Sequence, residues 1–300
     1  MTVIPAPTPS PFGEAFVALG RLEATAWRAG DPALLREAAD RCAALLDLTP
    51  SPAPDDLPAI PAVTDAARRA ALAFTSQFCV DVAALDEMTR VELTESLGPA
   101  TFDFVQAVFV FDYAPRVRAV LDVVCDEHID SSIGRPADPR LDPSATLWDA
   151  LDTFLGAVGR IRQLDPVTSE LVRLRGARQH NCRLCQSLRS RSAIRAGADD
   201  ELFALVDRPD SDGLTARHRA ALELTDAIIW HPARLDPSLV ADARRELDAV
   251  ERIELVLDVM RNAANKIAVA LSADAPHVSS GIEIYDIDED GQARYGLALP

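Results

Sequence analysis

Apolar residues recur along most of this chain at intervals of three and four positions, which is the spacing of one face of an α-helix. The stretches 16–26 and 253–267 show this spacing most clearly. Alternation of apolar and polar residues, which is typical of a half-buried strand, is almost absent before residue 280. The pattern therefore predicts an all-α fold.

The last segment of the chain departs from the helical pattern. Residues 282–287 alternate between apolar and polar side chains, residues 288–291 supply turn-forming aspartate and glycine, and a short stretch follows at 292–295. Two alternating runs joined by such a turn predict a small β-hairpin. We expect residues 276–300 to form a C-terminal tail that carries this hairpin.

Proline-rich stretches divide the chain. The segment up to Pro11 and the stretch Pro50–Pro61 should be extended loops, and a third break runs from Gly134 to Pro143. A chain of 300 residues is longer than one hydrophobic core usually serves. We therefore predict two helical units, at 1–133 and 134–275, ahead of the tail.

Short stretches of the first unit resemble stretches of the second at a constant offset of 150 positions. Chance similarity between alanine-rich helices is one explanation, but an offset shared by three segments favours duplication. The first unit contains no C-x-x-C motif, so a duplicate there would be degenerate, with its packing kept and its chemistry lost. The matched stretches are 69–75 with 219–225, 85–86 with 235–236, and 116–121 with 266–271.

The net charge of the chain limits the classes of partner that it can bind. Thirty lysines and arginines stand against 47 acids, for a net charge of −17, which disfavours nucleic acid and anionic membrane surfaces. The first residues lack the features of a secretory signal, and no uncharged apolar run reaches the length of a membrane helix. Five cysteines are an odd number and too few for a secreted disulfide framework. We expect a cytoplasmic protein.

Two of these cysteines, Cys182 and Cys185, form a C-x-x-C motif, whereas the other three stand alone in the sequence. Asn181 is a favourable N-cap residue, so we expect a helix to begin at Cys182 and to place both thiols, Arg189 and Ser192 on one stripe. One helical turn separates the two Cα atoms by about 5–6 Å, which permits a disulfide.

Positive charge gathers around this motif. Between residues 170 and 195, seven arginines face one acid, Glu170. Helix amides and nearby cations lower the pKa of a thiol and make it reactive, so the pattern favours redox-active cysteines. The alternative is that these arginines pair with acids from other helices. A zinc site is disfavoured because Cys125 is isolated and His180 would project differently from the motif. We expect no metal and no cofactor.

Glu170 lies twelve residues before Cys182, on a helix predicted over 167–179. An acid near a helix start can simply complement the helix dipole. It can also exchange protons with the thiols as a general acid and base. The spacing does not choose between these roles.

Together, Glu170, Cys182, Cys185 and a polar residue at 189 resemble the signature E-x(11)-C-x-x-C-x(3)-H of the alkylhydroperoxidase D / carboxymuconolactone decarboxylase family. The resemblance covers roughly residues 145–275. It implies an all-α homo-oligomer in which Cys185 attacks a hydroperoxide or small disulfide, Cys182 resolves the product, and Glu170 belongs to the proton relay. An external dithiol would supply electrons. Position along the helix alone would instead make Cys182 the more acidic thiol.

The family histidine is replaced here by Arg189, which cannot shuttle protons near neutral pH. His180 is the candidate for a replacement imidazole. The sequence thus predicts a thiol-dependent oxidoreductase. Two alternatives stay open: a decarboxylase that acts without thiol chemistry, and a noncatalytic helical binding or assembly protein with a redox-sensitive disulfide.

Overall fold

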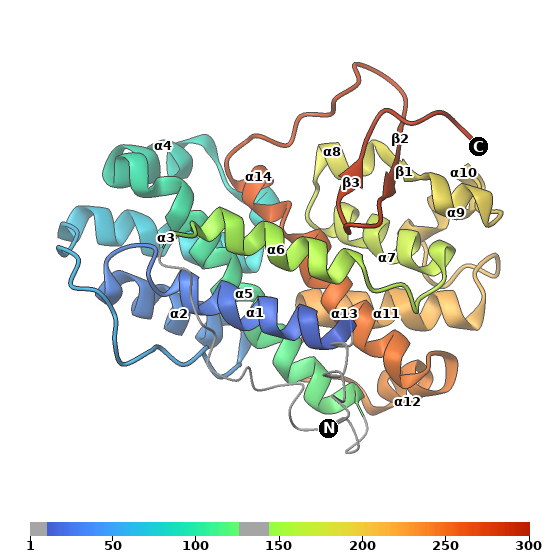
Figure 1. Cartoon of the computed structure of the whole chain (residues 1–300), viewed down its shortest axis with the longest axis horizontal. Coiled ribbons are helices and arrows are strands. Elements are labelled where there is room, and N and C mark those ends of the chain that lie inside the picture. Colours follow the sequence, from blue (N-terminus) through green and yellow to red (C-terminus); the bar gives the residue numbers. More distant parts are fainter. Residues whose placement is uncertain (1–10, 126–143) are drawn as a thin grey trace, which may run out of the picture.

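The computed structural model describes residues 11–125 and 144–300. Helices dominate these residues, and three short strands form one small sheet (Figure 1), so the predicted all-α fold with a C-terminal hairpin is confirmed. The predicted break at 134–143 and the proline-rich segment before Pro11 lie outside the described residues.

The first half of the chain is a set of packed helices. The proline-rich stretch 50–61 forms an irregular connection between the second and third of them, as predicted. A 3-10 turn at Val82–Ala84 and another at Gly98–Ala100 join the later helices. The helices are α1 (Pro11–Ala26), α2 (Pro32–Leu46), α3 (Asp65–Val80), α4 (Glu87–Leu97) and α5 (Thr101–Val124).

The second half repeats this arrangement with additional short elements. A 3-10 turn at Leu205–Asp207 and the strand β1 (Leu188–Ser190) belong to these additions. The tail contributes β2 (Glu283–Ile287) and β3 (Ala293–Arg294). The helices are α6 (Leu147–Gly159), α7 (Pro166–Gln179), α8 (Arg183–Gln186), α9 (Arg191–Arg195), α10 (Asp200–Ala204), α11 (Ala216–Trp230), α12 (Pro237–Glu246), α13 (Ala249–Ala263) and α14 (Lys266–Ala270).

Equivalent helices of the two halves make equivalent contacts. α2 packs against α3 and α5, and α7 packs in the same way against α11 and α13. α2 and α7 both begin with an aspartate cap followed by proline, at Asp31 and Asp165. The short elements from α8 to α10 are inserted between α7 and α11, where the first half has only its proline-rich loop. An offset of 150 positions aligns α3 with α11, whereas the caps of α2 and α7 are 134 positions apart, so the longer insertion after α7 changes the offset.

The two halves meet along a shared core. α1 packs on α6 and α5 packs on α13, and a single cluster of buried apolar residues runs through both halves. Arg116 and Lys266, which the repeat aligns, both bind the buried carboxylate of Asp112, Arg116 with its Nε at 2.9 Å and Lys266 with its Nζ at 2.7 Å. Because the halves share polar as well as apolar contacts, removal of one would expose core residues of the other.

The tail returns to the second half and completes the sheet. β2 and β3 pair antiparallel, with Ile287 opposite Ala293, around a turn at residues 288–291, which confirms the predicted hairpin. β1 pairs in parallel with β2, with Arg189 opposite Ile284. β1 was not predicted from the sequence, because three residues are too short to show alternation and their partner lies far along the chain.

Close backbone contact holds the hairpin turn against α6. A Cβ atom built on Gly159 would collide with the carbonyl oxygen of Gly291, and one built on Gly291 would collide with the carbonyl of Gly156. Gly291 also has φ +80°, a conformation that favours glycine. Arg162 adds hydrogen bonds to the carbonyls of residues 287 and 288 at 3.0 and 2.6 Å. The hairpin is therefore fixed to the helical body.

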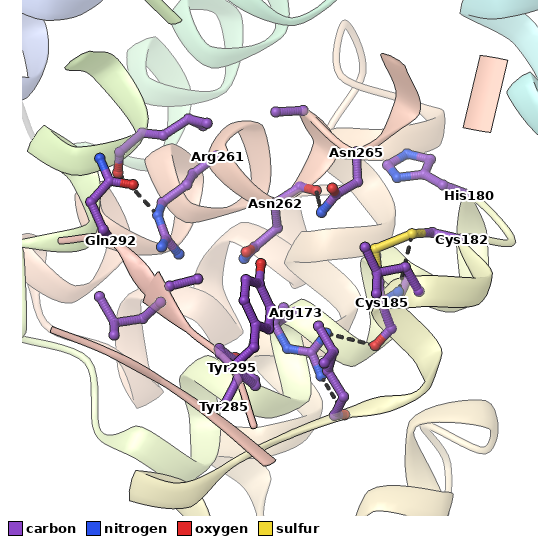
Figure 2. A pocket seen from close by; sticks show the side chains of 18 residues that line it. Arg173, His180, Cys182, Cys185, Arg261, Asn262, Asn265, Tyr285, Gln292 and Tyr295 are labelled. Carbon is purple, nitrogen blue, oxygen red and sulfur yellow. Dashed lines mark hydrogen bonds between the residues drawn. A yellow bond between two sulfur atoms is a disulfide. The ribbon is translucent and has the colours of Figure 1, made fainter. Parts of the chain in front are cut away.

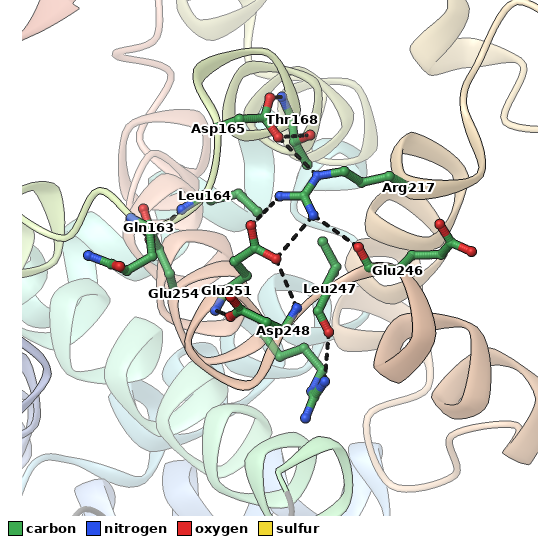
Figure 3. Close-up of polar contacts among 11 residues, drawn as sticks. Gln163, Leu164, Asp165, Thr168, Arg217, Glu246, Leu247, Asp248, Glu251 and Glu254 are labelled. Carbon is green, nitrogen blue, oxygen red and sulfur yellow. Dashed lines mark hydrogen bonds and ion pairs between the residues drawn. The ribbon is translucent and has the colours of Figure 1, made fainter.

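Arg217 of α11 fixes the start of α7, the helix that leads to the cysteines (Figure 3). Its guanidinium binds Asp165, the N-cap of α7, at 3.0 Å, and also binds Glu251 in the first turn of α13. Hydrogen bonds to these two acids, opposed by burial, raise the pKa of Arg217 above its usual value. One cation thus joins the N-termini of two helices that border the site.

Candidate functional site

The disulfide between Cys182 and Cys185 lies directly after α7. That helix ends at Gln179, Asn181 takes a positive φ of 50°, and the chain turns into the four-residue helix α8. The two Cα atoms are 5.3 Å apart. The predicted proximity of the cysteines is therefore confirmed, and the boundaries predicted for the preceding helix agree with α7 to within one residue.

The helix predicted to start at Cys182 is wrong in its cap and in its length. Cys182 itself is the N-cap, and its sulfur accepts a hydrogen bond from the amide of Cys185 at 3.2 Å. α8 ends at Gln186, and the chain then becomes the strand β1. Pairing with the tail strand β2 outweighs the local helical tendency here, so Arg189 and Ser192 do not continue the stripe of the cysteines.

Arg189 points away from the disulfide. Its Nη1 donates to the carbonyls of Gln186 and Leu188, and its guanidinium carbon lies 5.6 Å from the centre of the Phe203 ring. Its Nε is 3.8 Å from a carboxylate oxygen of Asp200. Arg189 does not line the cavity at the cysteines. The residue at the position of the family histidine is thus used for packing in this structure.

A cavity of about 180 Å³ opens beside the disulfide (Figure 2). Both sulfur-bearing residues are buried, with 1% of Cys182 and 5% of Cys185 exposed. The view shows the cysteines on one side of the cavity and Arg261 and Gln292 on the other, with the tail tyrosines between them. The polar lining residues are Arg173, His180, Arg261, Asn262, Asn265, Tyr285, Gln292 and Tyr295.

Glu170 is buried and does not line this cavity, and both of its carboxylate oxygens accept hydrogen bonds. Its two oxygens bind the guanidinium of Arg173, each at 2.7 Å. The amide of Ser190 donates to it at 3.0 Å and the hydroxyl of Tyr285 at 2.8 Å. Four hydrogen bonds satisfy both oxygens of this buried carboxyl group. Glu170 is therefore held in place by residues from three different elements, α7, β1 and β2.

Arg173 connects Glu170 to the cysteines. Its Nη1 donates to the carbonyl of Cys185 at 2.8 Å, and Figure 2 shows it next to Tyr285. Burial alone would lower the pKa of Arg173, but the carboxylate of Glu170 raises it above the usual value. Arg173 is therefore a permanent cation, and it holds the backbone of the C-x-x-C motif in place.

His180 reaches the cavity from the C-cap of α7. Its Nε2 lies 2.9 Å from the hydroxyl of Tyr113, which comes from α5 in the first half of the chain. Burial lowers the pKa of His180 well below its usual value, and the charges of Lys266 and Arg116 lower it further. The imidazole is therefore neutral near pH 7 and can accept or donate a proton through its ring nitrogens.

Most arginines around the motif pair with acids outside residues 170–195, whereas Arg173 pairs with Glu170 on its own helix. This is the alternative that the sequence left open, and it removes most of the local excess of positive charge. Burial and the neighbouring Arg173 also lower the pKa of Arg189. The pairs are Arg173 with Glu170, Arg175 with Asp226, Arg178 with Asp207, Arg183 with Asp274, Arg189 with Asp200, and Arg191 with Asp286.

A second cavity, of about 200 Å³, lies on the far side of a wall that contains Arg173, Arg261 and Tyr285. Two buried acids of α13 face it. Burial, reinforced by the charge of Asp258, raises the pKa of Glu254 to about 7. Burial raises the pKa of Asp258 to about 6, against the opposing charge of Arg261. These carboxyl groups can therefore bind or release protons near neutral pH.

Several site residues were not predicted from the sequence. Tyr285 belongs to the predicted hairpin, but no pattern placed that hairpin at the cysteines. Tyr113 lies in the half of the chain that lacks the motif, so only the tertiary contact reveals it. Asn262 and Asn265 also line the cavity, and no sequence pattern gave them a role. Of the predicted site residues, Cys182, Cys185 and His180 line the cavity. Glu170 is connected to the cysteines through Arg173, and Arg189 lies outside the cavity.

Other site types find no support in the described residues. Within 11–125 and 144–300, no three histidines, cysteines or acids are arranged to hold a metal ion. No helix in the same ranges is both long enough and apolar enough to cross a membrane.

The chain is similar in sequence to uncharacterized proteins of two bacterial species. No family model and no solved structure matches it. Uncharacterized protein YnjA of Escherichia coli strain K12 is 34% identical over 104 residues, which are 34% of this chain and 57% of YnjA. Uncharacterized proteins Rv2313c and MT2376, from two strains of Mycobacterium tuberculosis, are each 45% identical over 227 residues, which are 74% of this chain and 79% of theirs. With that identity over most of both chains, this protein belongs to the family of the mycobacterial protein Rv2313c.

Proposed function

We propose that the protein is a thiol-dependent oxidoreductase that reduces a hydroperoxide or a small disulfide at Cys182 and Cys185. The observation that carries the proposal is a C-x-x-C pair at bonding distance on the wall of a cavity, with His180 beside it. The resemblance to the alkylhydroperoxidase D family, carried by Glu170 and the two cysteines, points to the same chemistry.

With a hydroperoxide, the reaction passes through a sulfenic acid on one cysteine. The thiolate of Cys185, the more exposed of the two cysteines, attacks the O–O bond, the alcohol leaves with a proton, and a sulfenic acid forms. The sulfur of Cys182 then displaces water and closes the disulfide. An external dithiol restores both thiols by exchange. Two electrons from the cysteines thus reduce one hydroperoxide to an alcohol and water.

Residues around the cysteines have matching roles in this proposal. The neutral His180, held by Tyr113, takes the place of the family histidine as the proton carrier. The ion pair of Glu170 and Arg173 positions the motif through the carbonyl of Cys185. Arg189 has no part, because it does not line the cavity.

The test is peroxide turnover with an excess of a dithiol donor. Cys185→Ser should abolish turnover, whereas Cys125→Ser, which changes a cysteine outside the site, should retain it. Cys182→Ser should trap the sulfenic acid on Cys185, where dimedone would label it. Helical circular dichroism should be unchanged in all three variants. Full turnover by folded Cys185→Ser would rule the proposal out, and dimedone label on Cys182 in Cys185→Ser would reverse the two roles.

One observation favours a second candidate, the noncatalytic protein with a redox-sensitive disulfide. Both sulfurs are almost fully buried, as in a structural bridge. In that case a reductant would lower the melting temperature, and the reduced protein would consume no peroxide beyond its own thiols. Catalytic turnover with a dithiol donor separates the two functions.

A further inference from the structure

A second pair of cysteines lies in the first half of the chain, where the sequence shows no motif. Cys42 is on α2 and Cys79 is near the end of α3, 37 positions later. Their sulfur atoms are 2.9 Å apart. Both residues are buried, with 0% of Cys42 and 5% of Cys79 exposed. Neither the spacing nor the surrounding sequence predicts this contact.

The distance between these sulfurs is shorter than an ordinary van der Waals contact and approaches the length of a disulfide bond. A disulfide joins its sulfurs at about 2.05 Å, so a closure of about 0.9 Å would suffice. Rotation of the two side chains about their Cα–Cβ bonds moves the sulfur atoms over distances of this size. A free pair of buried cysteines needs no such approach, since each packs as a small apolar side chain.

We propose that Cys42 and Cys79 form a second disulfide, which links α2 to α3 and makes the first half of the chain a second, slower redox couple oxidised by hydrogen peroxide. The inference does not depend on the proposed function of the Cys182–Cys185 pair. It assigns chemistry to the half of the chain that lacks a C-x-x-C motif.

Cys79 is the cysteine that an oxidant would reach first. It lines a small cavity of about 10 Å³, which also borders His180, Trp230 and Lys266, whereas Cys42 does not line it. Such a cavity has room for about one water molecule, so a bulky hydroperoxide would be excluded and hydrogen peroxide is the suitable probe.

The oxidation balances in two steps. The thiolate of Cys79 attacks one oxygen of hydrogen peroxide, the O–O bond breaks, and the released hydroxide takes up a proton to leave as water. The sulfur of Cys42 then attacks the sulfenic acid and a second water leaves. Burial, and then the neighbouring Cys42, raise the pKa of the Cys79 thiol well above its usual value. Because little thiolate is present, the reaction should be slow.

Thiol counting on the full chain tests the proposal. The reduced protein should show five thiols after unfolding in guanidinium chloride, since the chain has five cysteines. Hydrogen peroxide should lower the count to three in a fast phase and to one in a slower phase. The Cys182→Ser/Cys185→Ser variant should show only the slow loss of two thiols, whatever the activity of the wild type.

Peptide mapping identifies the bond. Trypsin separates the two cysteines, because Cys42 falls in peptide 42–68 and Cys79 in peptide 70–90. A linked pair of these peptides, two hydrogens lighter than the free peptides and lost on reduction, is the expected result. In the Cys182→Ser/Cys185→Ser variant, the bond should raise Tm by roughly 5–10 °C. Both peptides recovered as separate alkylated thiols after prolonged oxidation, or as sulfinic acids without a link, would overturn the proposal.

Discussion

The hydroxyl of Tyr285 donates a hydrogen bond of 2.8 Å to the carboxylate of Glu170, which lies 115 positions earlier in the chain. Through this bond the C-terminal hairpin becomes part of the candidate site. Tyr285 is buried, and it forms part of the wall between the two cavities. The tail therefore contributes to the structure of the site as well as covering it.

Tyr285→Phe should weaken this arrangement while keeping the shape of the ring. Because a hydrogen bond to a charged group contributes about 1.5–3 kcal/mol, we expect a loss of that size in the free energy of unfolding in urea. The matched control is Tyr295→Phe. Tyr295 lines the same cavity, but its hydroxyl makes no hydrogen bond to a described residue, so its loss should cost less than 0.5 kcal/mol. Equal losses in the two variants would contradict the role given to Tyr285.

Glu170→Gln should be strongly destabilising. The substitution leaves Arg173 as a buried cation without its anion, and breaking such a pair costs about 3–5 kcal/mol. Asp242→Asn, which removes an acid from an exposed pair with Arg245, should cost less than 1 kcal/mol. Urea unfolding of both variants makes the comparison. A stable Glu170→Gln protein that loses only turnover would show that Glu170 serves catalysis rather than the fold.

Short-range sequence patterns predicted the helices and the hairpin, because interactions between neighbouring residues determine these elements. The helix around Glu170 follows from its apolar spacing and from the Asp165 cap with its following proline. The hairpin follows from alternation and from a turn that contains Gly291. In each case the residues that specify the element lie within a few positions of one another, so no knowledge of the tertiary fold was needed.

Contacts between distant segments could not be predicted in this way. The strand at Arg189 exists because the tail pairs with it, and that pairing overrides the helix predicted from the C-x-x-C motif. The positive charge near the cysteines is paired with acids such as Asp226 and Asp274, which the sequence places far away. The contact between Cys42 and Cys79 depends on how α2 packs on α3. Periodicity gives the buried face of a helix but not its partner.

Gly159→Ala should displace the hairpin from α6. The added methyl group would overlap the carbonyl oxygen of Gly291, and overpacking of this kind costs about 1–3 kcal/mol. We also expect faster trypsin cleavage after Arg294, because that residue lies in β3. Gly176→Ala in α7 is the control. Nothing lies within 4 Å of an added Cβ there, so the helix should gain about 0.5–1 kcal/mol. Slow cleavage of Gly159→Ala would mean that the turn adapts to the methyl group.

Asp258→Asn should change the pH dependence of stability. The carboxylate of Asp258 accepts no hydrogen bond from a described residue and only 9% of the residue is exposed, and burial raises its pKa from 3.8 to about 6. Between these pH values the folded state holds a proton that the unfolded state has lost. The free energy of unfolding therefore falls as pH rises through this window, by roughly 3 kcal/mol in all.

An asparagine does not ionise, so the variant should lack this loss. Urea unfolding at pH 4 and pH 8 measures this difference. Compared with wild type, the free energy of unfolding of the variant should be more favourable at pH 8 than at pH 4, by roughly 1–3 kcal/mol. Glu254, whose pKa the charge of Asp258 helps to raise, should titrate lower in the variant and add to the gain. The control is Glu95→Gln, at an exposed acid of α4, which should change the free energy of unfolding by the same amount at pH 4 and at pH 8. If Asp258→Asn shows the same pH dependence as wild type, the pKa of Asp258 is the same in the folded and the unfolded protein, and burial does not raise it.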